Sequence, residues 1–164
     1  MLKLSKRADY GLIALKHLAT HGRKQSASAK QIGARYGIPV ALMSKVLQTL
    51  TREGFLCSEH GTRGGYRLAQ DPRLISALAV IRAIDGPIIL TACFTEHGDC
   101  DQSDRCTVRE PLRKVHEGIL DLLAGITITD MTEAEAEEPD GSDWNDSETR
   151  LYSVQSPASA VAEP

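Results

Sequence analysis

Three of the chain's four cysteines lie in a single fourteen-residue segment, residues 93–106, with the spacing Cys-x6-Cys-x5-Cys. Most residues between them are Gly, Asp, Ser, Gln and Glu, which favour turns and bury little apolar surface. Such a segment is not held in place by packing of its own, whereas thiolates converging on a metal would hold it. We therefore expect a metal-binding loop. The alternative is a reduced loop whose thiols bind nothing, or a pair that oxidises adventitiously.

The spacing of the cysteines indicates the kind of metal centre. Neither gap is as short as those between the paired cysteines of structural zinc sites. Wider gaps let the loop surround a larger object, and iron–sulfur clusters are bound mainly by cysteine thiolates. A cluster normally takes four ligands, and Cys57 lies in an apolar run where a small buried residue is expected. The fourth ligand is therefore expected to be oxygen or nitrogen, or to come from elsewhere.

The apolar runs and the number of cysteines indicate where in the cell the protein is expected. It contains no run of about 18 apolar residues and begins without the apolar region of a signal peptide, so no membrane partner is expected. Four cysteines, three of them clustered, are not a secreted disulfide framework. We expect a cytoplasmic protein.

Charge is distributed unevenly along the chain. Residues 1–70 carry twelve Lys and Arg against three acidic residues, a balance of +9. Residues 71–131 carry six basic and ten acidic side chains, which gives −4, and residues 132–164 carry one against nine, which gives −8. A basic first half favours a polyanionic partner such as DNA. The alternative is a solvated basic face.

Three short helices are predicted in the basic half. Ser5 can cap a first helix over residues 5–21. Ser28-Ala-Lys-Gln31 is a capping-box pattern that opens a second helix, with Gly37 just past its end. A third helix is expected over residues 40–53 after a short turn. Two helices joined in this way form a helix-turn-helix.

The third helix is expected to have a buried and an exposed face. The buried stripe consists of Leu42, Val46 and Leu50, with Met43 and Leu47 alongside. The exposed face consists of Ala41, Ser44, Lys45, Gln48 and Arg52. A small, polar outer face suits a recognition helix that enters a DNA groove.

Two short strands, residues 55–58 and 66–69, are predicted directly after the third helix. Three glycines between them permit a tight hairpin. A hairpin in this position is a wing, and it places His60 and Arg63 at its tip, near a DNA backbone or minor groove. If the helix-turn-helix pattern is taken without the wing, the alternative is an ordinary helical hairpin.

Two further helices are predicted beyond residue 70. Asp71-Pro72 begins one whose inner face carries Leu74, Leu78 and Ile81. Thr107-Val-Arg-Glu110 is a capping box for a long helix to about residue 124. Its apolar stripe consists of Val108, Leu112, Val115, Ile119 and Leu122. We interpret it as a dimerisation helix; the alternative is packing on the chain's own first helix.

The sequence resembles the IscR/NsrR-type family of winged-helix regulators that sense iron–sulfur clusters. The matching stretches are residues 4–11, 38–54 and 60–68, together with the three clustered cysteines. The resemblance covers residues 1–131 and looks most similar to the regulators of the SUF iron–sulfur assembly system. It implies a homodimeric, cytoplasmic bacterial transcription factor that holds one cluster per subunit.

The resemblance also implies roles for individual residues. Cys93, Cys100 and Cys106 match the family's cysteine ligands of a cluster, with 2Fe–2S favoured and 4Fe–4S the alternative. Arg109 stands where some members have a ligating histidine. Asp9 matches the acidic ligand that others supply from the partner subunit, and further candidates are His97, Asp99 and Glu110. The DNA-binding residues expected are Ala41, Ser44, Lys45, Gln48, His60 and Arg63.

The expected fold is mainly α: a winged helix-turn-helix DNA-binding region over residues 1–70, then a helix, cluster loop and dimerisation helix over 71–131. Residues 132–164, acidic and rich in Ser, Pro, Ala and Glu, are expected to be a disordered tail. The expected function is a cluster-sensing transcriptional repressor of iron–sulfur assembly genes that binds a double-stranded DNA operator. The alternatives are a cluster-free thiol-redox regulator and an iron–sulfur carrier or assembly protein. No catalytic constellation supports an enzyme with Cys106 as nucleophile.

Overall fold

The computed structural model describes residues 3–21, 26–61, 64–94, 100–102 and 105–133. Most of these residues are helical, and the described strands form one two-stranded sheet. In chain order the elements are α1 (Lys6–Thr20), α2 (Ala29–Tyr36), α3 (Val40–Arg52), β1 (Leu56–Glu59), β2 (Gly65–Leu68), the 3-10 turn η1 (Pro72–Leu74), α4 (Ala77–Asp85), the 3-10 turn η2 (Ala92–Phe94), α5 (Arg109–Gly125) and α6 (Ile128–Glu133).

The first two helices begin and end where the sequence predicts. The Ser5 hydroxyl accepts the backbone N–H of Ala8 at 3.1 Å, which caps α1. Ser28 and Gln31 form the capping box of α2, and Gly37 ends that helix in the left-handed region at φ 64°. A left-handed residue favours glycine because it has no Cβ to clash. The chain therefore turns directly into α3.

The core lies where α1, α2 and α3 meet. Met43, Val46, Leu47 and Leu50 of α3 are buried there with apolar residues of the two preceding helices. The prediction that Leu42 belongs to the buried stripe is wrong, because its side chain is 40% exposed. The buried residues of α3 include Thr49. The buried face is therefore rotated relative to the predicted stripe, and Leu42 lies at the edge of the core.

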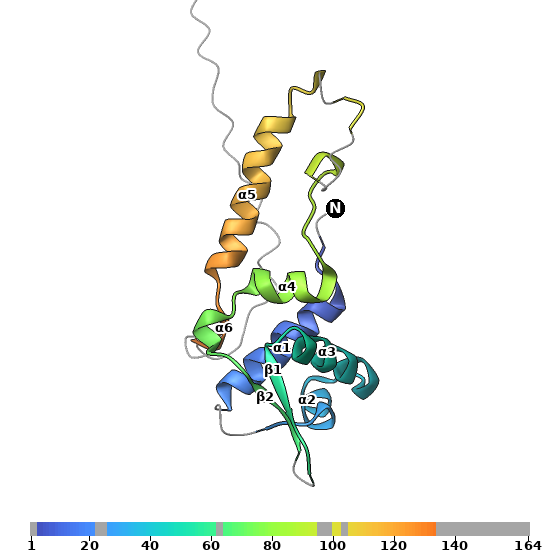
Figure 1. Cartoon of the computed structure of the whole chain (residues 1–164), viewed down its shortest axis with the longest axis vertical. Helices are drawn as coiled ribbons and strands as arrows, with labels where there is room; N and C mark the ends of the chain where they lie inside the picture. The colour runs from blue at the N-terminus through green and yellow to red at the C-terminus, as the bar shows by residue number, and fades with distance from the viewer. Residues whose placement is uncertain (1–2, 22–25, 62–63, 95–99, 103–104, 134–164) are drawn as a thin grey trace, which may run out of the picture.

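The wing is an antiparallel hairpin. β1 pairs with β2 in a register that sets Leu56 opposite Leu68 and Glu59 opposite Gly65. Leu56 and Leu68 are buried and attach the hairpin to the core, while its far end extends away from the helices (Figure 1). Tyr66 also pairs with Ala27 through two backbone hydrogen bonds of 2.9 and 3.0 Å, which joins the hairpin to the start of α2.

The segment after the wing differs from the prediction. Asp71 caps only the short turn η1, and Ser76 caps a separate helix, α4. Leu74 is therefore 78% exposed rather than part of an inner helix face, which corrects the expectation for that residue. Leu78 and Ile81 are buried as expected.

The short helix α6 is not predicted from the sequence. Its first residue, Ile128, is fully buried, and its backbone N–H donates to the carbonyl of Ile75 at 2.9 Å. Thr127 and Asp130 exchange the hydrogen bonds of a capping box at its start. The sequence Thr127-Ile-Thr-Asp130 carries this signal. Through α6 and α4 the chain covers α1.

α5 stands away from this body and runs beside the segment that follows α4 (Figure 1). None of its residues is buried, and it contacts the rest of the chain mainly at α4. The expected capping box of Thr107 and Glu110 is not formed, because the helix begins after Val108 without a side-chain cap. Glu110 pairs with Arg113 instead. Among the described residues, no helix is long and apolar enough to cross a membrane.

Candidate nucleic-acid interface and cysteine arm

The outer face of α3 is the surface expected to read DNA. Ala41, Lys45, Gln48 and Arg52 are exposed and Ser44 is half-buried, as the helical period predicts. Val40 and Leu42, which sequence reasoning did not place on this surface, are also 46% and 40% exposed. The start of the helix thus presents an apolar patch next to its polar outer face, of a kind that can contact thymine methyl groups.

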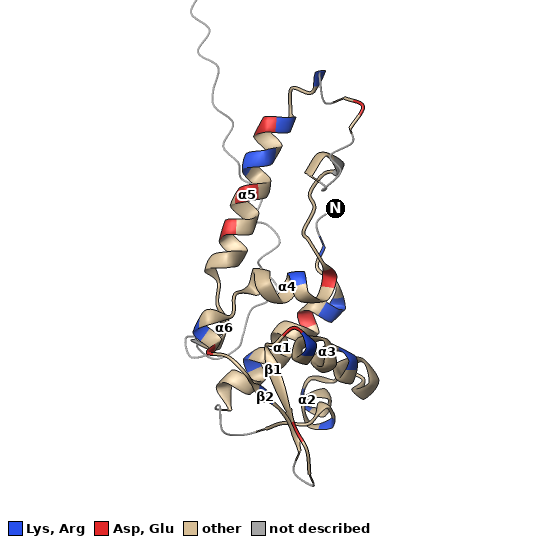
Figure 2. Cartoon of the chain, in the orientation of Figure 1, with Lys and Arg blue, Asp and Glu red and all other residues tan. Residues whose placement is uncertain are grey.

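The charge around this helix is predominantly positive. Lys and Arg are spread over α1, α2 and α3 with few acidic residues among them, whereas α5 carries both signs (Figure 2). The first turns of α2 and α3 contain no acidic residue. These helices would therefore approach phosphates without a like-charge penalty.

In the wing, His60 is exposed directly after β1, and Arg63 lies outside the described residues. Arg67 and Glu59 form an ion pair across the two strands, with 2.6 Å between Nε and Oε1. A Cβ at Gly64 would lie 2.3 Å from the carbonyl oxygen of Glu59, so the turn requires glycine there. These contacts give the described part of the hairpin a defined shape.

The cysteines of the predicted loop lie at the end of an arm made by α5 and residues 86–94 (Figure 1). Cys93 is in η2, where its Sγ lies 3.0 Å from the Thr91 hydroxyl, and Cys106 comes two residues before the N-cap of α5. Cys93, Cys100 and Cys106 are all half-buried free thiols. Across the part of the chain that the structure describes, no three His, Cys, Asp or Glu side chains converge as a metal site.

Cys57 lies apart from the arm, in β1 of the wing. Its Sγ is 3.7 Å from the carbonyl oxygen of Arg67. The expectation that it is a buried residue is only partly right, because its side chain is half-buried at the surface of the hairpin. It is not near the other three thiols (Figure 1).

Sequence reasoning missed His116, which faces the inner side of the arm. Its ring stacks on that of Phe94, with centroids 5.1 Å apart and an interplanar angle of 23°. Its Nδ1 is buried and has no hydrogen-bond partner. The only sequence signal for His116 is that it lies one helical turn from apolar residues of α5. The described residues do not bring this nitrogen together with the three thiols as one metal site.

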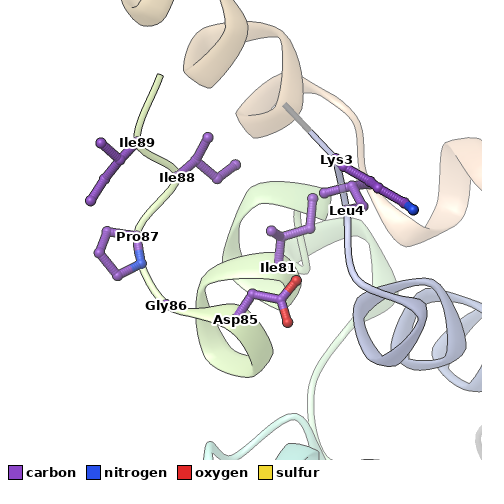
Figure 3. A pocket seen from close by; sticks show the side chains of 8 residues that line it. All are labelled: Lys3, Leu4, Ile81, Asp85, Gly86, Pro87, Ile88 and Ile89. Carbon is purple, nitrogen blue, oxygen red and sulfur yellow. The ribbon is translucent and has the colours of Figure 1, made fainter. Parts of the chain in front are cut away.

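The base of the arm contains a small hollow of about 160 Å³. Leu4, Ile81 and Ile88 point into it, whereas Ile89 points outward and is 42% exposed (Figure 3). Asp85 lies on one side of the hollow and accepts a hydrogen bond from the hydroxyl of Ser5, the residue directly before α1. The arm is therefore anchored to the start of α1.

The proposed fourth-ligand residues lie in different places. Asp9 is exposed in the first turn of α1, in the body rather than on the arm. Glu110 lies in the first turn of α5, and the hydrogen bond from Arg113 lowers the pKa of its carboxyl group. His97 and Asp99 lie outside the described residues. Within one subunit the described residues therefore bring none of these oxygens to the three thiols.

Comparison with known proteins matches residues 4–134 to the Rrf2 family, described as an iron-dependent transcriptional regulator. The regulator IscR of Vibrio vulnificus is 31% identical over 130 residues, which covers 79% of this chain and 77% of that protein. T. potens IscR superposes with a TM-score of 0.66 at 29% identity, covering 85% of this chain and 94% of that one. CymR, the global cysteine regulator of B. subtilis, gives 0.69 at 26%, covering 82% and 98%. These relatives are regulators rather than enzymes. The chain belongs to the Rrf2 family of winged-helix transcriptional regulators and is of the IscR/NsrR type.

Proposed function

We propose that this regulator is a homodimeric repressor of iron–sulfur assembly genes whose operator affinity depends on an iron–sulfur cluster. The observation that carries the proposal is the placement of three thiols on an arm whose base is tied to the N-terminus of α1. A change at the arm then has a short route to the helices that face DNA. The protein would act in the cytoplasm, like the family it resembles.

Cys93, Cys100 and Cys106 would hold the cluster, with 2Fe–2S favoured over 4Fe–4S. When bound, the cluster would supply a centre that is sensitive to oxidation and nitric oxide. The three half-buried thiols provide its anchoring ligands.

The fourth ligand would be Asp9 of the partner subunit. Arg109 cannot bind a metal, and Glu110 is already engaged by Arg113. Asp9 is exposed and has no ion pair with a described residue. A carboxylate binds iron more weakly than a thiolate does, so the cluster would be labile, as a sensor requires. His97 and Asp99 are the alternatives, and Asp9→Ala would distinguish them by hastening loss of the visible absorption.

Residues 1–70 would bind the operator and residues 71–131 would carry the cluster and the dimer contact. Ala41, Ser44, Lys45 and Gln48 would enter the major groove, since the exposed face of α3 is narrow and mostly polar. His60 and Arg63 of the wing would contact the backbone or minor groove. The predicted start of the acidic tail at residue 132 is wrong, because residues 132 and 133 belong to α6. Residues 134–164, which lie outside the described residues, would form the tail.

Anaerobic purification followed by visible absorption and by iron and sulfide analysis tests the cluster. Wild-type protein should be coloured and contain both elements, and Cys100→Ser should be bleached. Cys57→Ser is the matched control, because this thiol lies in the wing, and it should retain the colour. Colourless wild-type protein with stoichiometric zinc would exclude the cluster.

A cluster-free thiol-redox regulator is the second candidate. It is favoured by the similarity to CymR, a cysteine regulator, and by three half-buried thiols that do not converge. Under this alternative the colourless protein would lose operator affinity on oxidation. A disulfide between two of the three thiols, located by peptide mass analysis, would accompany the loss.

A further inference from the structure

A second hollow, of about 280 Å³, lies between α1 and α2, away from the cysteine arm. The described residues that line it are His17, Leu18, His21, Ser26, Ala27, Gln31 and Arg35. No carboxylate is among them. His17 is a buried polar residue, with 7% of its surface exposed, although neither DNA binding nor a cluster on the arm requires it.

The two imidazoles are held through their Nδ1 atoms, and neither Nε2 has a hydrogen-bond partner among the described residues. His21 Nδ1 lies 2.8 Å from the carbonyl oxygen of His17 and must donate, since a carbonyl only accepts. His17 Nδ1 lies 3.3 Å from the Tyr36 hydroxyl. The two rings are in contact in a tilted arrangement, with centroids 4.1 Å apart and 35° between their planes. When protonated, both Nε2 atoms are hydrogen-bond donors.

The other polar groups of the hollow are donors too. The Gln31 side-chain oxygen already accepts the N–H and hydroxyl of Ser28, at 2.8 and 2.9 Å, so its NH2 group remains. Arg35 is exposed, forms no ion pair with any described carboxylate and lies over the Tyr36 ring. A guanidinium next to two imidazoles disfavours a metal cation and favours an anion.

We propose that the hollow between α1 and α2 binds a small anion with phosphate-like or carboxylate chemistry, held by Arg35, Gln31 and the Nε2 atoms of His17 and His21. The anion would connect the central helix of the body to the first helix of the helix-turn-helix. Without it, burial, His21 and Arg35 together lower the pKa of His17. A bound anion opposes these effects, so its affinity should increase as the pH falls and the imidazoles take up protons.

The test uses the full-length chain with labelled histidine nitrogens. Inorganic phosphate, and separately succinate, is titrated at constant ionic strength at acidic and neutral pH, while NMR follows the ring nitrogens of His17 and His21. Saturable shifts are expected for at least one anion, stronger at the lower pH. Arg35→Gln should weaken that affinity about tenfold or more. Arg73→Gln, which removes an equal charge beside Asp71, should leave it unchanged.

Three results would overturn the proposal. Shifts that do not saturate, or that are the same in Arg35→Gln, would show that no site exists. Shifts that duplex DNA produces and neither small anion does would assign the hollow to the DNA backbone. Saturation by zinc chloride without a response to either anion would make the histidine pair a metal site. None of these outcomes depends on the cluster, so they are separate from the proposed sensing function.

Discussion

The Ser5 hydroxyl donates a hydrogen bond to Asp85 Oδ1 at 2.6 Å, and the Ser5 backbone N–H donates to Oδ2 at 3.2 Å. The same hydroxyl oxygen accepts the Ala8 N–H and caps α1. Asp85 is the last residue of α4, after which the chain enters the arm. The Ser5 side chain therefore caps the start of α1 and joins it to the base of the cysteine arm.

Ser5→Ala should lower the free energy of unfolding by roughly 1–2 kcal/mol, since it removes both the N-cap and the bond to Asp85. Urea unfolding followed by circular dichroism measures the change. Ser58→Ala is the control, because Ser58 is exposed in β1 and its side chain makes no hydrogen bond with a described residue. Equal stability of Ser5→Ala and wild type would show that the contact contributes nothing in solution.

Gly33→Ala should destabilise the helix-turn-helix. A Cβ there would lie 2.7 Å from the Ile38 carbonyl oxygen, a backbone atom that cannot move without opening the turn. Overpacking of this kind costs about 1–3 kcal/mol. Gly118→Ala in α5 meets nothing within 4 Å and should be neutral or stabilising by up to about 1 kcal/mol, because alanine favours helix. Thermal unfolding of both variants compares them; a harmless Gly33→Ala would contradict the geometry of the turn.

Lowering the pH should destabilise the protein through His17. Burial, and then the neighbouring His21 and Arg35, lower its pKa from the ordinary value of 6.5. The unfolded chain then takes up the proton first, so stability is complete above about pH 6.5 and decreases as the pH falls below it. His17→Gln should flatten this decrease in urea unfolding between neutral and mildly acidic pH. His60→Gln, an exposed wing variant, should not change the profile.

Features set by neighbouring residues could be predicted from the sequence. The Ser28–Gln31 capping box and the left-handed Gly37 depend on a few adjacent positions, so the ends of α2 agree with prediction. The exposure of Lys45 and Gln48 follows from helical period. The wing follows from its glycines and from its position after α3.

Features set by contacts between residues far apart in the chain could not be predicted from the sequence. Leu42 has the period of a core residue, but the rotation of α3 is fixed by its packing partners. Asp71-Pro72 has the form of a helix start, yet Ile75 turns inward to meet Ile128 and a new helix begins at Ser76.

The outward stripe of α5 should form the dimer contact. Val115 and Leu122 of α5 and its N-cap Val108 are 52%, 66% and 56% exposed, and the seven-residue spacing places them on one side of the helix, as a helix–helix contact requires. Val115→Glu should convert a wild-type dimer into a monomer in sedimentation velocity. Leu74→Glu, at a leucine that is 78% exposed in η1, should remain dimeric. A monomeric wild type at the same concentration would contradict the dimer.

Operator binding should depend on α3 in two distinguishable ways. Ser44 and Lys45 lie on the outer face of this helix, where the major groove presents a different pattern for each base pair. Replacing a residue that reads a base should change the preference among operator variants by roughly 1–3 kcal/mol, whereas loss of a phosphate contact should weaken all sequences and reduce the salt slope by about 1. Fluorescence anisotropy with an operator selected from randomised duplexes, measured over a range of salt, separates these effects for Ser44→Ala and Lys45→Ala.

Arg73→Ala is the matched control for charge, since Arg73 lies in η1 and pairs with Asp71. It should leave both affinity and salt slope unchanged. If Ser44→Ala and Lys45→Ala also bind the operator as the wild type does, α3 is not the recognition helix. If binding requires these residues but is equal with and without the cluster, the protein regulates transcription without sensing through the arm, because the Ser5–Asp85 connection then transmits nothing to α3.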